Sequence, residues 1–554
     1  MKAKFARVFV LMGLSMLLFH CSNKNNEEVD KLFSHYNHET PGVAIAVMKK
    51  GNIIYKKGYG NANLEYDIPV SSSTIFHIAS ISKQFTVFSV LLLEKEGKLS
   101  LDDDIRKYIP ELPDFGHTIT LRHLASHTSG LRDQWNLLAL AGWRLDDVIT
   151  KEHVLKLVNA QKELNFEPGE EFVYCNTGFT LLAEIVSRVS NMSFQEYTSK
   201  NIFQPLGMAN SLFYDDHEKI VPNRAYSYYL DSSGYKKSVL NYANVGATSL
   251  FTTVEDLALW AFNFSSPQIG EPKIFDQMNT MAVLNNGKTF GGGLGQFIGE
   301  YKGLNQIQHG GADAGYRSFF VRFPEQDFSV AVFSNDASFD AAGMAYKIVD
   351  IYLKDELTEV KQEPSKEEVP SIDPKIIQAY LGDYELQPGF IISITEENGS
   401  LFGQGTGQPK FFMKPVSDTE FAVAEVEAKI VFYPDQEGKV DLFKLHQGGQ
   451  IIDVVRTTVF DTSSVEISEF TGRFYSEELS TAYDFIQKDN QLIARHSRLT
   501  DIMLKASKKD FFSGNAWFFG QVEFIRDSVG NVDGCYVSSG RVRNLLFRKI
   551  NPKK

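Results

Sequence analysis

The last third of the chain repeats itself at an offset of about 90 residues, so this part must fold as two copies of one unit. Tyr380-Leu381-Gly382-Asp383-Tyr384 corresponds to Phe470-Thr471-Gly472-Arg473-Phe474 at an offset of 90, and Arg456 corresponds to Arg548 at an offset of 92. Each copy is rich in short alternating runs separated by Gly and Asp turns, which is typical of antiparallel strands. We therefore predict two small antiparallel β-barrels or sandwiches, over residues 372–460 and 464–552.

The part before the repeat mixes strand and helix patterns and predicts an α+β domain over residues 28–355. Strand-like runs lie near both ends of this part, and the helical patterns lie mostly between them, so strands from the two ends are expected to share one sheet. A charged, Pro-containing stretch, residues 356–371, is typical of a linker. The strand-like runs are 42–48, 53–59, 321–323 and 328–333, and the helical ones are 152–160, 177–190, 254–263 and 341–353.

A serine and a lysine three residues apart, Ser80 and Lys83, open a long apolar run. Apolar residues recur at spacings of three and four over residues 85–92, which predicts a buried helix. A serine in the first turn of such a helix lies beside the lysine amine, one of the few ways to activate serine without histidine. The same pattern at residues 233–236 lies in a turn-like stretch, which disfavours that copy. The competing interpretation of Ser80 is an N-cap serine with a chance lysine.

Two further clusters follow in the chain. In the first, a turn after Pro168-Gly169 would bring Tyr174 and Asn176 to one cleft ahead of the next helix. In the second, His309-Gly310-Gly311-Ala312, the glycines would let a backbone edge approach a substrate. Both patterns also occur elsewhere in the chain, so neither is specific alone. Their order after Ser80 is what points to one active site.

In this order and context the chain resembles the class C β-lactamase and D-alanyl-D-alanine carboxypeptidase-like serine hydrolases. The resemblance covers about residues 30–355 and implies a catalytic domain in which helices flank an antiparallel sheet. The layout, with two C-terminal repeats, looks like that of D-aminopeptidase, which implies lipocalin-like barrels. The resemblance rests on Ser80-x-x-Lys83, Tyr174-x-Asn176 and His309-Gly310-Gly311, with support from residues 119–131 and 252–257.

The resemblance also implies a mechanism. Ser80 would attack a carbonyl, and Lys83 and Tyr174 would share the general-base and general-acid roles. Asn176 would hold Lys83 and the substrate amide. The backbone N–H groups of Ser80 and Ala312 would form the oxyanion hole, which requires geometry rather than a particular side chain.

The third motif departs from the Lys-Thr-Gly of β-lactamases. His309 is mostly neutral near pH 7, and Gly310 offers no hydroxyl, which argues against efficient β-lactam hydrolysis. We still count His309 as catalytic and Gly310 and Gly311 as substrate-binding. The expected activity is hydrolysis of an ester, D-amino-acid amide or peptide through a Ser80 acyl-enzyme. A genuine class C-like β-lactamase and a non-catalytic envelope protein that binds peptidoglycan fragments are the alternatives.

The first 21 residues have the composition of an export signal. Three basic residues within the first seven positions precede an apolar stretch, residues 8–19, which is too short to span a bilayer. Cys21 follows and precedes a polar segment, which resembles a bacterial lipoprotein signal with Cys21 lipidated. His20 replaces the usual small residue, so plain secretion and an uncleaved anchor are alternatives. We expect an exported cell-envelope lipoprotein, facing the periplasm or on the outer-membrane surface.

Charge and composition narrow the partners. The formal balance of 56 − 69 = −13 and the lack of a basic stripe make nucleic acid an unexpected partner. Cys175 and Cys535 fall in different predicted domains, so disulfides are not the framework. His123 and His127 have the spacing of zinc ligands, but residues 128–130 end their helix, so packing or hydrogen bonding is the preferred interpretation. We predict no metal and no cofactor, and a small-molecule or peptide substrate.

Overall fold

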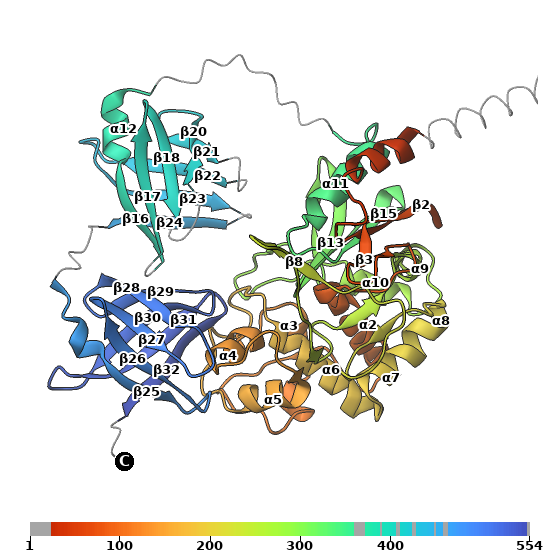
Figure 1. The fold of residues 1–554 in the computed structure, drawn as a ribbon, viewed down its shortest axis with the longest axis horizontal. Coiled ribbons are helices and arrows are strands. Elements are labelled where there is room, and N and C mark those ends of the chain that lie inside the picture. The colour runs from red at the N-terminus through yellow and green to blue at the C-terminus, as the bar shows by residue number, and fades with distance from the viewer. Residues whose placement is uncertain are drawn as a thin grey trace, which may run out of the picture. The chain divides into compact units, whose positions relative to one another are not determined.

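The computed structural model describes residues 24–358, 372–387, 390–405, 410–423, 428–447, 450–457 and 464–550 (Figure 1). The chain forms two compact units. The first contains residues up to 134 and residues 145–359, and the second contains residues 135–144 and everything from residue 360 onward. The expected signal segment with Cys21 lies outside the described residues, as do residues 359–371 of the expected linker.

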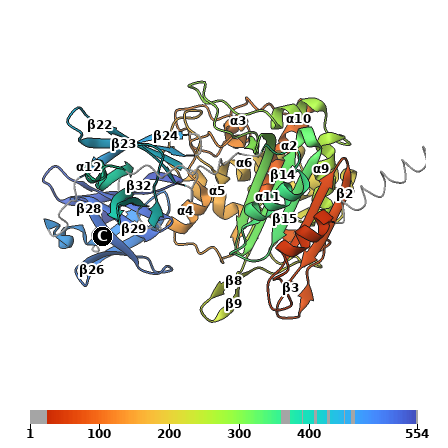
Figure 2. The same cartoon turned by 90° about the horizontal axis from the view of Figure 1, so that it is seen from above.

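A six-stranded antiparallel sheet forms the centre of the first unit, in the order β12-β13-β14-β15-β1-β2. β1 pairs with β15 with Val43 opposite Ser334, so strands from the two ends of the domain meet in one sheet, as the sequence predicted. Several of these strands run in one layer in Figure 2. The strands are β1 (Val43–Lys49), β2 (Asn52–Tyr59), β12 (Phe297–Tyr301), β13 (Leu304–Asp313), β14 (Tyr316–Phe323) and β15 (Phe328–Ser334).

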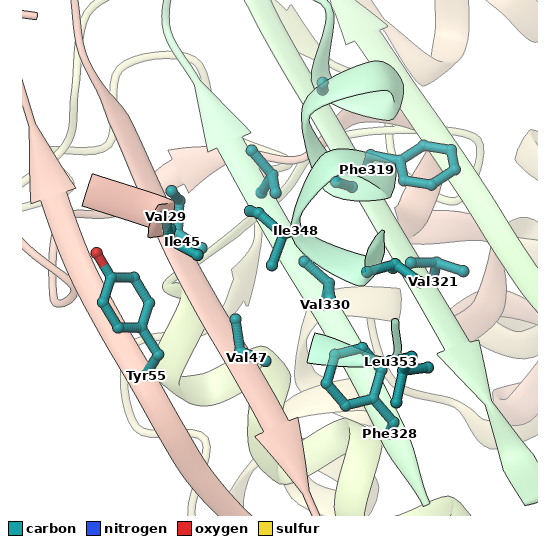
Figure 3. Packing of buried hydrophobic residues seen from close by; sticks show 14 of the residues in the cluster. Val29, Ile45, Val47, Tyr55, Phe319, Val321, Phe328, Val330, Ile348 and Leu353 are labelled. Carbon is teal, nitrogen blue, oxygen red and sulfur yellow. The ribbon is translucent and has the colours of Figure 1, made fainter. Parts of the chain in front are cut away.

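One face of the sheet is covered by the helix over residues 24–32 and by α11 (Ala341–Tyr352), which contacts β14 and β15. Ile348 of α11 lies over the sheet beside Val330, and Val29 lies beside Ile45 (Figure 3). These side chains are fully buried, and each such side chain contributes about 1.5–3 kcal/mol of transfer free energy. The alternating apolar residues of the strands therefore explain why the two helices pack on this face.

The helices that position the site lie in the rest of this unit. α9 contacts β1 and β15, and α2 packs on α6. The predicted helices at 152–160, 177–190 and 254–263 are all present, within two residues at each end. The helices are α2 (Ser82–Lys95), α3 (Leu121–Ala125), α5 (Lys151–Asn159), α6 (Asn176–Ser190), α7 (Phe194–Thr198), α8 (Gln204–Leu206), α9 (Val254–Ser265) and α10 (Pro272–Met278). Short strands are β3 (Asn61–Asn63), β4 (Ile68–Pro69), β5 (Phe76–His77), β6 (Ile149–Thr150), β7 (Leu212–Phe213), β8 (Tyr228–Asp231), β9 (Gly234–Lys237), β10 (Tyr242–Ala243) and β11 (Leu250–Thr252).

The first C-terminal repeat is a nearly closed antiparallel barrel preceded by α12 (Pro374–Tyr380). Its strands follow the order β19-β18-β17-β16-β24-β23-β22-β21-β20. They are β16 (Gly382–Gln387), β17 (Phe390–Glu397), β18 (Ser400–Gly405), β19 (Lys410–Phe412), β20 (Lys414–Pro415), β21 (Glu420–Val423), β22 (Ala428–Pro434), β23 (Val440–Gln447) and β24 (Gln450–Thr457).

The second repeat is a closed barrel of strands β25 to β32 in sequence order. Gly382 and Gly472 begin the first strand of each barrel with φ of 135° and 139°, a region that favours glycine. Tyr384 and Phe474 follow two residues later, and both are fully buried. The strands are β25 (Gly472–Ser476), β26 (Thr481–Lys488), β27 (Gln491–Arg495), β28 (Ile502–Lys508), β29 (Phe511–Ala516), β30 (Phe519–Arg526), β31 (Val532–Ser539) and β32 (Val542–Ile550).

A ten-residue segment from the N-terminal part of the chain, residues 135–144, belongs to the second unit. It contains most of α4 (Gln134–Leu140). The Asn136 side-chain amide donates to Ser539 Oγ at 2.9 Å, and the Tyr483 hydroxyl donates to the Leu140 carbonyl at 3.1 Å. No motif or periodicity in the sequence predicts this association. The segment's buried apolar residues are Leu137, Leu138, Ala139 and Leu140.

Among the residues that the structure describes, no helix has the length and apolar character needed to span a bilayer.

Candidate active site

Ser80 lies in the middle of a single 3₁₀ turn, η1 (Ala79–Ile81), directly before α2. The sequence pattern predicted Ser80 in the first turn of α2, whereas the structure places it in the turn just before that helix. Ala79 has φ of 47°, a left-handed conformation that costs a non-glycine residue about 1 kcal/mol or more. The Ser82 hydroxyl donates to the Ala79 carbonyl at 2.5 Å and helps to hold this turn. Ser80 is the one residue with partial exposure between Thr74 and Leu91, so the turn presents it alone.

Lys83 is fully buried, and its amine lies beside the nucleophile and two carbonyl oxygens. Lys83 Nζ lies 3.0 Å from Ser80 Oγ, 2.9 Å from Asn176 Oδ1 and 2.7 Å from the Ala247 carbonyl oxygen. The two carbonyl oxygens can only accept, so they take hydrogens of the amine. A neutral amine 3.0 Å from Ser80 Oγ can take the proton of the Ser80 hydroxyl on its lone pair.

The orientation of Asn176, the first residue of α6, is set by Asp133. Asp133 Oδ2 accepts from the Asn176 backbone N–H at 2.7 Å and from its side-chain amide nitrogen at 2.8 Å. A carboxylate oxygen accepts, so the amide nitrogen faces Asp133 and the amide oxygen faces Lys83. Asp133 is completely buried. Sequence reasoning missed it, because a single acid three residues beyond Gly130 has no distinguishing pattern.

Tyr174 reaches the same place from the segment before α6. Its ring centroid lies 4.9 Å from Lys83 Nζ. The His127 ring stacks on it at 4.2 Å and 27°, and His127 Nδ1 accepts from the Cys175 N–H at 3.0 Å. His123, by contrast, caps α3 through its backbone and ring. The two histidines therefore have packing and hydrogen-bonding roles, as the sequence favoured.

His309 lies on β13 and is held as a neutral ring. Its Nδ1 is 2.6 Å from the Gly310 carbonyl oxygen, which can only accept, so Nδ1 carries the proton. Burial, helped by the charge of Lys83, lowers the pKa of His309 to about 3. Its buried Nε2 has no hydrogen-bond partner among the described residues. The third motif thus offers a hydrogen-bond acceptor at Nε2, and no cation.

β13 approaches the Ser80 turn closely at Gly311. A Cβ on Gly311 would lie 2.3 Å from the Ile78 carbonyl oxygen, so no side chain fits. The Ser318 hydroxyl donates to the same carbonyl at 2.8 Å. Pairing between β12 and β13 ends at Gln308, so over residues 309–313 this edge of β13 has no strand partner in the described part of the chain. The backbone groups of residues 310–312 that point away from β14 are therefore available beside Ser80.

Half-buried aromatic rings surround this group, and the sequence did not identify them. Phe172 stacks on Phe290 at 4.6 Å, and Phe297 lies 5.3 Å from His309 and 6.4 Å from Tyr174 between ring centroids. Phe290 and Phe297 are more than 100 residues from Tyr174 in the sequence, in stretches with no motif. Only the tertiary fold brings them together.

The structure thus brings Ser80, Lys83, Tyr174, Asn176 and His309 together in the first unit. The second Ser-x-x-Lys copy is elsewhere: Ser233 lies in the β8–β9 turn, where its hydroxyl donates to Asp231 at 2.7 Å.

Comparison with family models agrees with this geometry. The model of the beta-lactamase family matches residues 29–353, which is more than half of the chain and includes all three motifs. A domain of unknown function, DUF3471, matches residues 366–456, the region of the first barrel.

Curated relatives and solved structures extend the match. Penicillin-binding protein 4* of Bacillus subtilis is 27% identical over 445 residues, which cover 76% of this chain and 96% of the relative. A D-aminopeptidase of Brucella anthropi is 23% identical over 533 residues, covering 93% of this chain and 96% of the relative. The octameric penicillin-binding protein homologue from Pyrococcus abyssi superposes with a TM-score of 0.55 at 24% identity, covering 78% of this chain and 99% of that one. At that identity the superposition shows the fold.

Proposed function

Because this chain belongs to the beta-lactamase family, we propose that it hydrolyses an ester, a D-amino-acid amide or a peptide through an acyl-enzyme on Ser80. The observation that carries the proposal is the arrangement of Lys83. Its amine lies 3.0 Å from Ser80 Oγ and also contacts the Asn176 side-chain oxygen and the Ala247 carbonyl oxygen, which hold it in place. Relatives named D-aminopeptidase and penicillin-binding protein support an acyl-transfer reaction.

In the first step Ser80 Oγ attacks the substrate carbonyl carbon, and the Ser80 proton moves to Lys83 Nζ. The carbonyl oxygen becomes an oxyanion, which the backbone N–H groups of Ser80 and Ala312 stabilise. Loss of one donor of this kind typically costs about 10²–10³ in rate. The closeness of Gly311 to the Ser80 turn supports this pairing of donors from two segments.

In the second step the C–O or C–N bond to the leaving group breaks, and the leaving group takes a proton from Lys83 or Tyr174. Lys83 Nζ lies close to the Tyr174 ring, which supports a shared acid–base role for the two. Water then attacks the acyl–Ser80 ester and gives a proton to the same pair. The bond between the acyl carbon and Ser80 Oγ breaks, the pair returns the proton to Oγ, and the acid leaves.

His309 distinguishes this proposal from β-lactam hydrolysis. A neutral imidazole with a lone pair at Nε2 cannot attract the carboxylate that β-lactams carry. This supports hydrolysis of uncharged or amine-bearing acyl groups over that of β-lactams.

Labelling with a fluorophosphonate probe followed by peptide mapping tests the proposal. We expect one adduct, on Ser80, and loss of both labelling and ester turnover in Ser80→Ala. Ser233→Ala is the matched control because it removes the serine of the duplicate motif, and it should behave like the native protein. Turnover that persists in Ser80→Ala would overturn the assignment, and specific binding of peptidoglycan fragments without turnover would favour a non-catalytic role.

We also propose that the protein is an exported lipoprotein of the bacterial cell envelope, tethered through Cys21. The basic start, the short apolar stretch and Cys21 support this. Radiolabelled palmitate should be incorporated into the native protein and into Cys535→Ser, but not into Cys21→Ser. Equal incorporation in all three would exclude Cys21 as the anchor.

A further inference from the structure

A second polar group lies on the same strand as His309. Residues 309, 311 and 313 of β13 share one face, because side chains alternate along a strand and the register is unbroken. Asp313 is therefore on the face that Gly311 turns toward the Ser80 segment. Its side chain is only 15% exposed.

The Asp313 carboxylate accepts a hydrogen bond from a hydroxyl and has no cation within ion-pair distance among the described residues. The Thr248 hydroxyl donates to Oδ2, and His77 Nε2 lies 3.9 Å away. The Ala79 N–H donates to His77 Nδ1 at 3.2 Å, so the ring proton is on Nε2. Burial lowers the pKa of His77 to about 3, so this ring is neutral. No lysine or arginine lies within ion-pair distance of Asp313 in the described part of the chain.

The nearby arginine is already engaged elsewhere. Arg317 Nη1 donates to the carbonyl oxygens of Ala314 and Tyr316 at 3.1 and 2.7 Å. Lys83 and Arg317 act on the Asp313 carboxylate only from beyond ion-pair distance. A mostly buried carboxylate with no cation in direct contact is unfavourable unless a ligand supplies the positive charge. Burial does raise the pKa of Asp313, to about 6, so the group is ionised at neutral pH and above.

The position of this carboxylate relates it to the reacting atoms. Asp313 directly follows Ala312, whose N–H is the proposed oxyanion donor. Thr248 directly follows Ala247, whose carbonyl accepts from Lys83 Nζ at 2.7 Å. Asp313 is thus next to the proposed oxyanion donor, and Thr248, which donates to its carboxylate, is next to a residue that holds Lys83.

On the basis of the proposed hydrolase function, we propose that Asp313 binds the protonated α-amine of the acyl group being transferred. The preferred substrates are then amino-acid amides and esters, or peptides, with a free N-terminus. The unpartnered Nε2 of His309 on the same strand face is also an acceptor, so the two polar groups both favour donors on the substrate. Asp313 is a specificity residue here and takes no part in bond cleavage.

The test compares two substrates that differ only at the amine: D-alanine p-nitroanilide and its N-acetyl derivative. We expect native kcat/KM to favour the free amine at pH 7.5. In Asp313→Asn this preference should fall by about ten- to a hundred-fold, the range expected for a charge-assisted hydrogen bond. Thr248→Val, which removes the hydroxyl that orients the carboxylate, should reduce the preference by a smaller factor.

The matched control is Asp350→Asn. Asp350 is an acid of the same unit and lies on α11. Its carboxylate accepts from Lys302 at 2.7 Å and from Tyr301 at 3.0 Å. Its loss removes one carboxylate and should leave the preference unchanged. Equal losses for both substrates in Asp313→Asn would show a structural role for Asp313 and overturn the proposal.

A binding measurement separates this proposal from the hydrolase assignment. 1-Aminoethylboronic acid and ethylboronic acid both form an adduct with an active serine, and only the first carries the amine. We expect tighter binding of the aminoboronate to the native protein and nearly equal binding to Asp313→Asn. Ser80 labelling with no amine preference would overturn the Asp313 proposal alone. Failure of both boronates and of the fluorophosphonate to react would overturn the hydrolase assignment, and the Asp313 proposal with it.

Discussion

The side-chain amide nitrogen of Asn176 lies 2.8 Å from Oδ2 of Asp133, and this contact determines which atom of Asn176 faces Lys83. The buried carboxylate also accepts from the Asn176 backbone N–H. Lys83, the proposed general base, is thus oriented through Asn176 by an acid that does not contact Ser80.

Asp133→Asn should therefore lower activity more than stability. Both hydrogen bonds from Asn176 end on Asp133 Oδ2. The neutral amide oxygen of an asparagine can accept both, but more weakly than a carboxylate does, so Asn176 is held less firmly. We expect the rate of fluorophosphonate labelling at Ser80 to fall about 10²-fold, the scale for small misplacements in active sites. Labelling at the native rate, with circular dichroism confirming the fold, would show that Asp133 has no positioning role.

His309→Gln should reduce the sensitivity of the fold to acid. The folded pKa of His309, about 3, lies below its ordinary value of 6.5, so the unfolded chain takes up the proton first. The contribution of His309 to the unfolding free energy is fully present above about pH 6.5. It is lost as the pH falls toward 3, by about 1.4 kcal/mol per pH unit. The variant should lose less unfolding free energy than the native protein between pH 6.5 and 4 in urea titrations. His77 keeps its own dependence in both proteins, and parallel curves would contradict the prediction.

Asp313→Asn should stabilise the fold at neutral pH while it weakens amine selectivity. Burial raises the folded pKa to about 6 from 3.8, against the opposing effects of Thr248, Lys83 and Arg317. The folded state then binds the proton more tightly than the unfolded chain. The unfolding free energy of the native protein therefore falls as the pH rises from about 4 to 6, by up to about 3 kcal/mol. The nearby His77 stays neutral over this range.

In the Asn variant this fall should be absent, and its advantage over the native protein should grow from pH 4 to pH 7. Burial, and to a lesser extent the charge of Asp313, raises the pKa of Tyr242 well above its ordinary value. Its hydroxyl therefore stays protonated over this pH range and does not contribute to the pH dependence of stability. A variant less stable than the native protein at pH 7 would mean that the carboxylate has a supporting role in the fold.

Deleting residues 464–554 should destabilise the N-terminal part of the chain as well. Residues 135–144 would lose the hydroxyl of Tyr483 and the surface that buries their leucines. The segment begins two residues after Asp133. We expect a lower melting temperature and slower Ser80 labelling. Tyr483→Phe, which removes only the hydrogen bond to Leu140, should lower stability by about 1 kcal/mol. A truncated protein with native melting and labelling would refute this dependence.

The regular elements and the motif order were accessible from sequence because their signals are local. The apolar periodicity after Lys83 predicts α2, the pattern after Asn176 predicts α6, and the repeat at Gly382 and Gly472 predicts two barrels. All three are confirmed by the fold. β14 is longer than predicted, because its first half, from Tyr316, lacks a clean alternation.

The groups that sequence reasoning missed depend on tertiary contacts. Ala79 holds a left-handed conformation for which glycine would be the usual signal. Phe290 and Phe297 come from a stretch without periodicity. The tertiary fold alone brings Phe290 onto Phe172 and Phe297 onto Tyr174. Asp313 follows the third motif directly, yet its lack of a cation can be recognised only when its neighbours are placed.

The association of residues 135–144 with the second barrel bears on how such a protein can be rearranged by recombination or by an engineer. A single exchanged fragment that starts at the linker would contain the barrel but not residues 135–144. The recipient would then keep its own version of this segment, which would face a barrel that it does not match. Exchange of this barrel between homologues therefore requires that residues 135–144 be exchanged together with it. The two regions should co-vary in sequence across relatives even though more than 300 residues separate them along the chain.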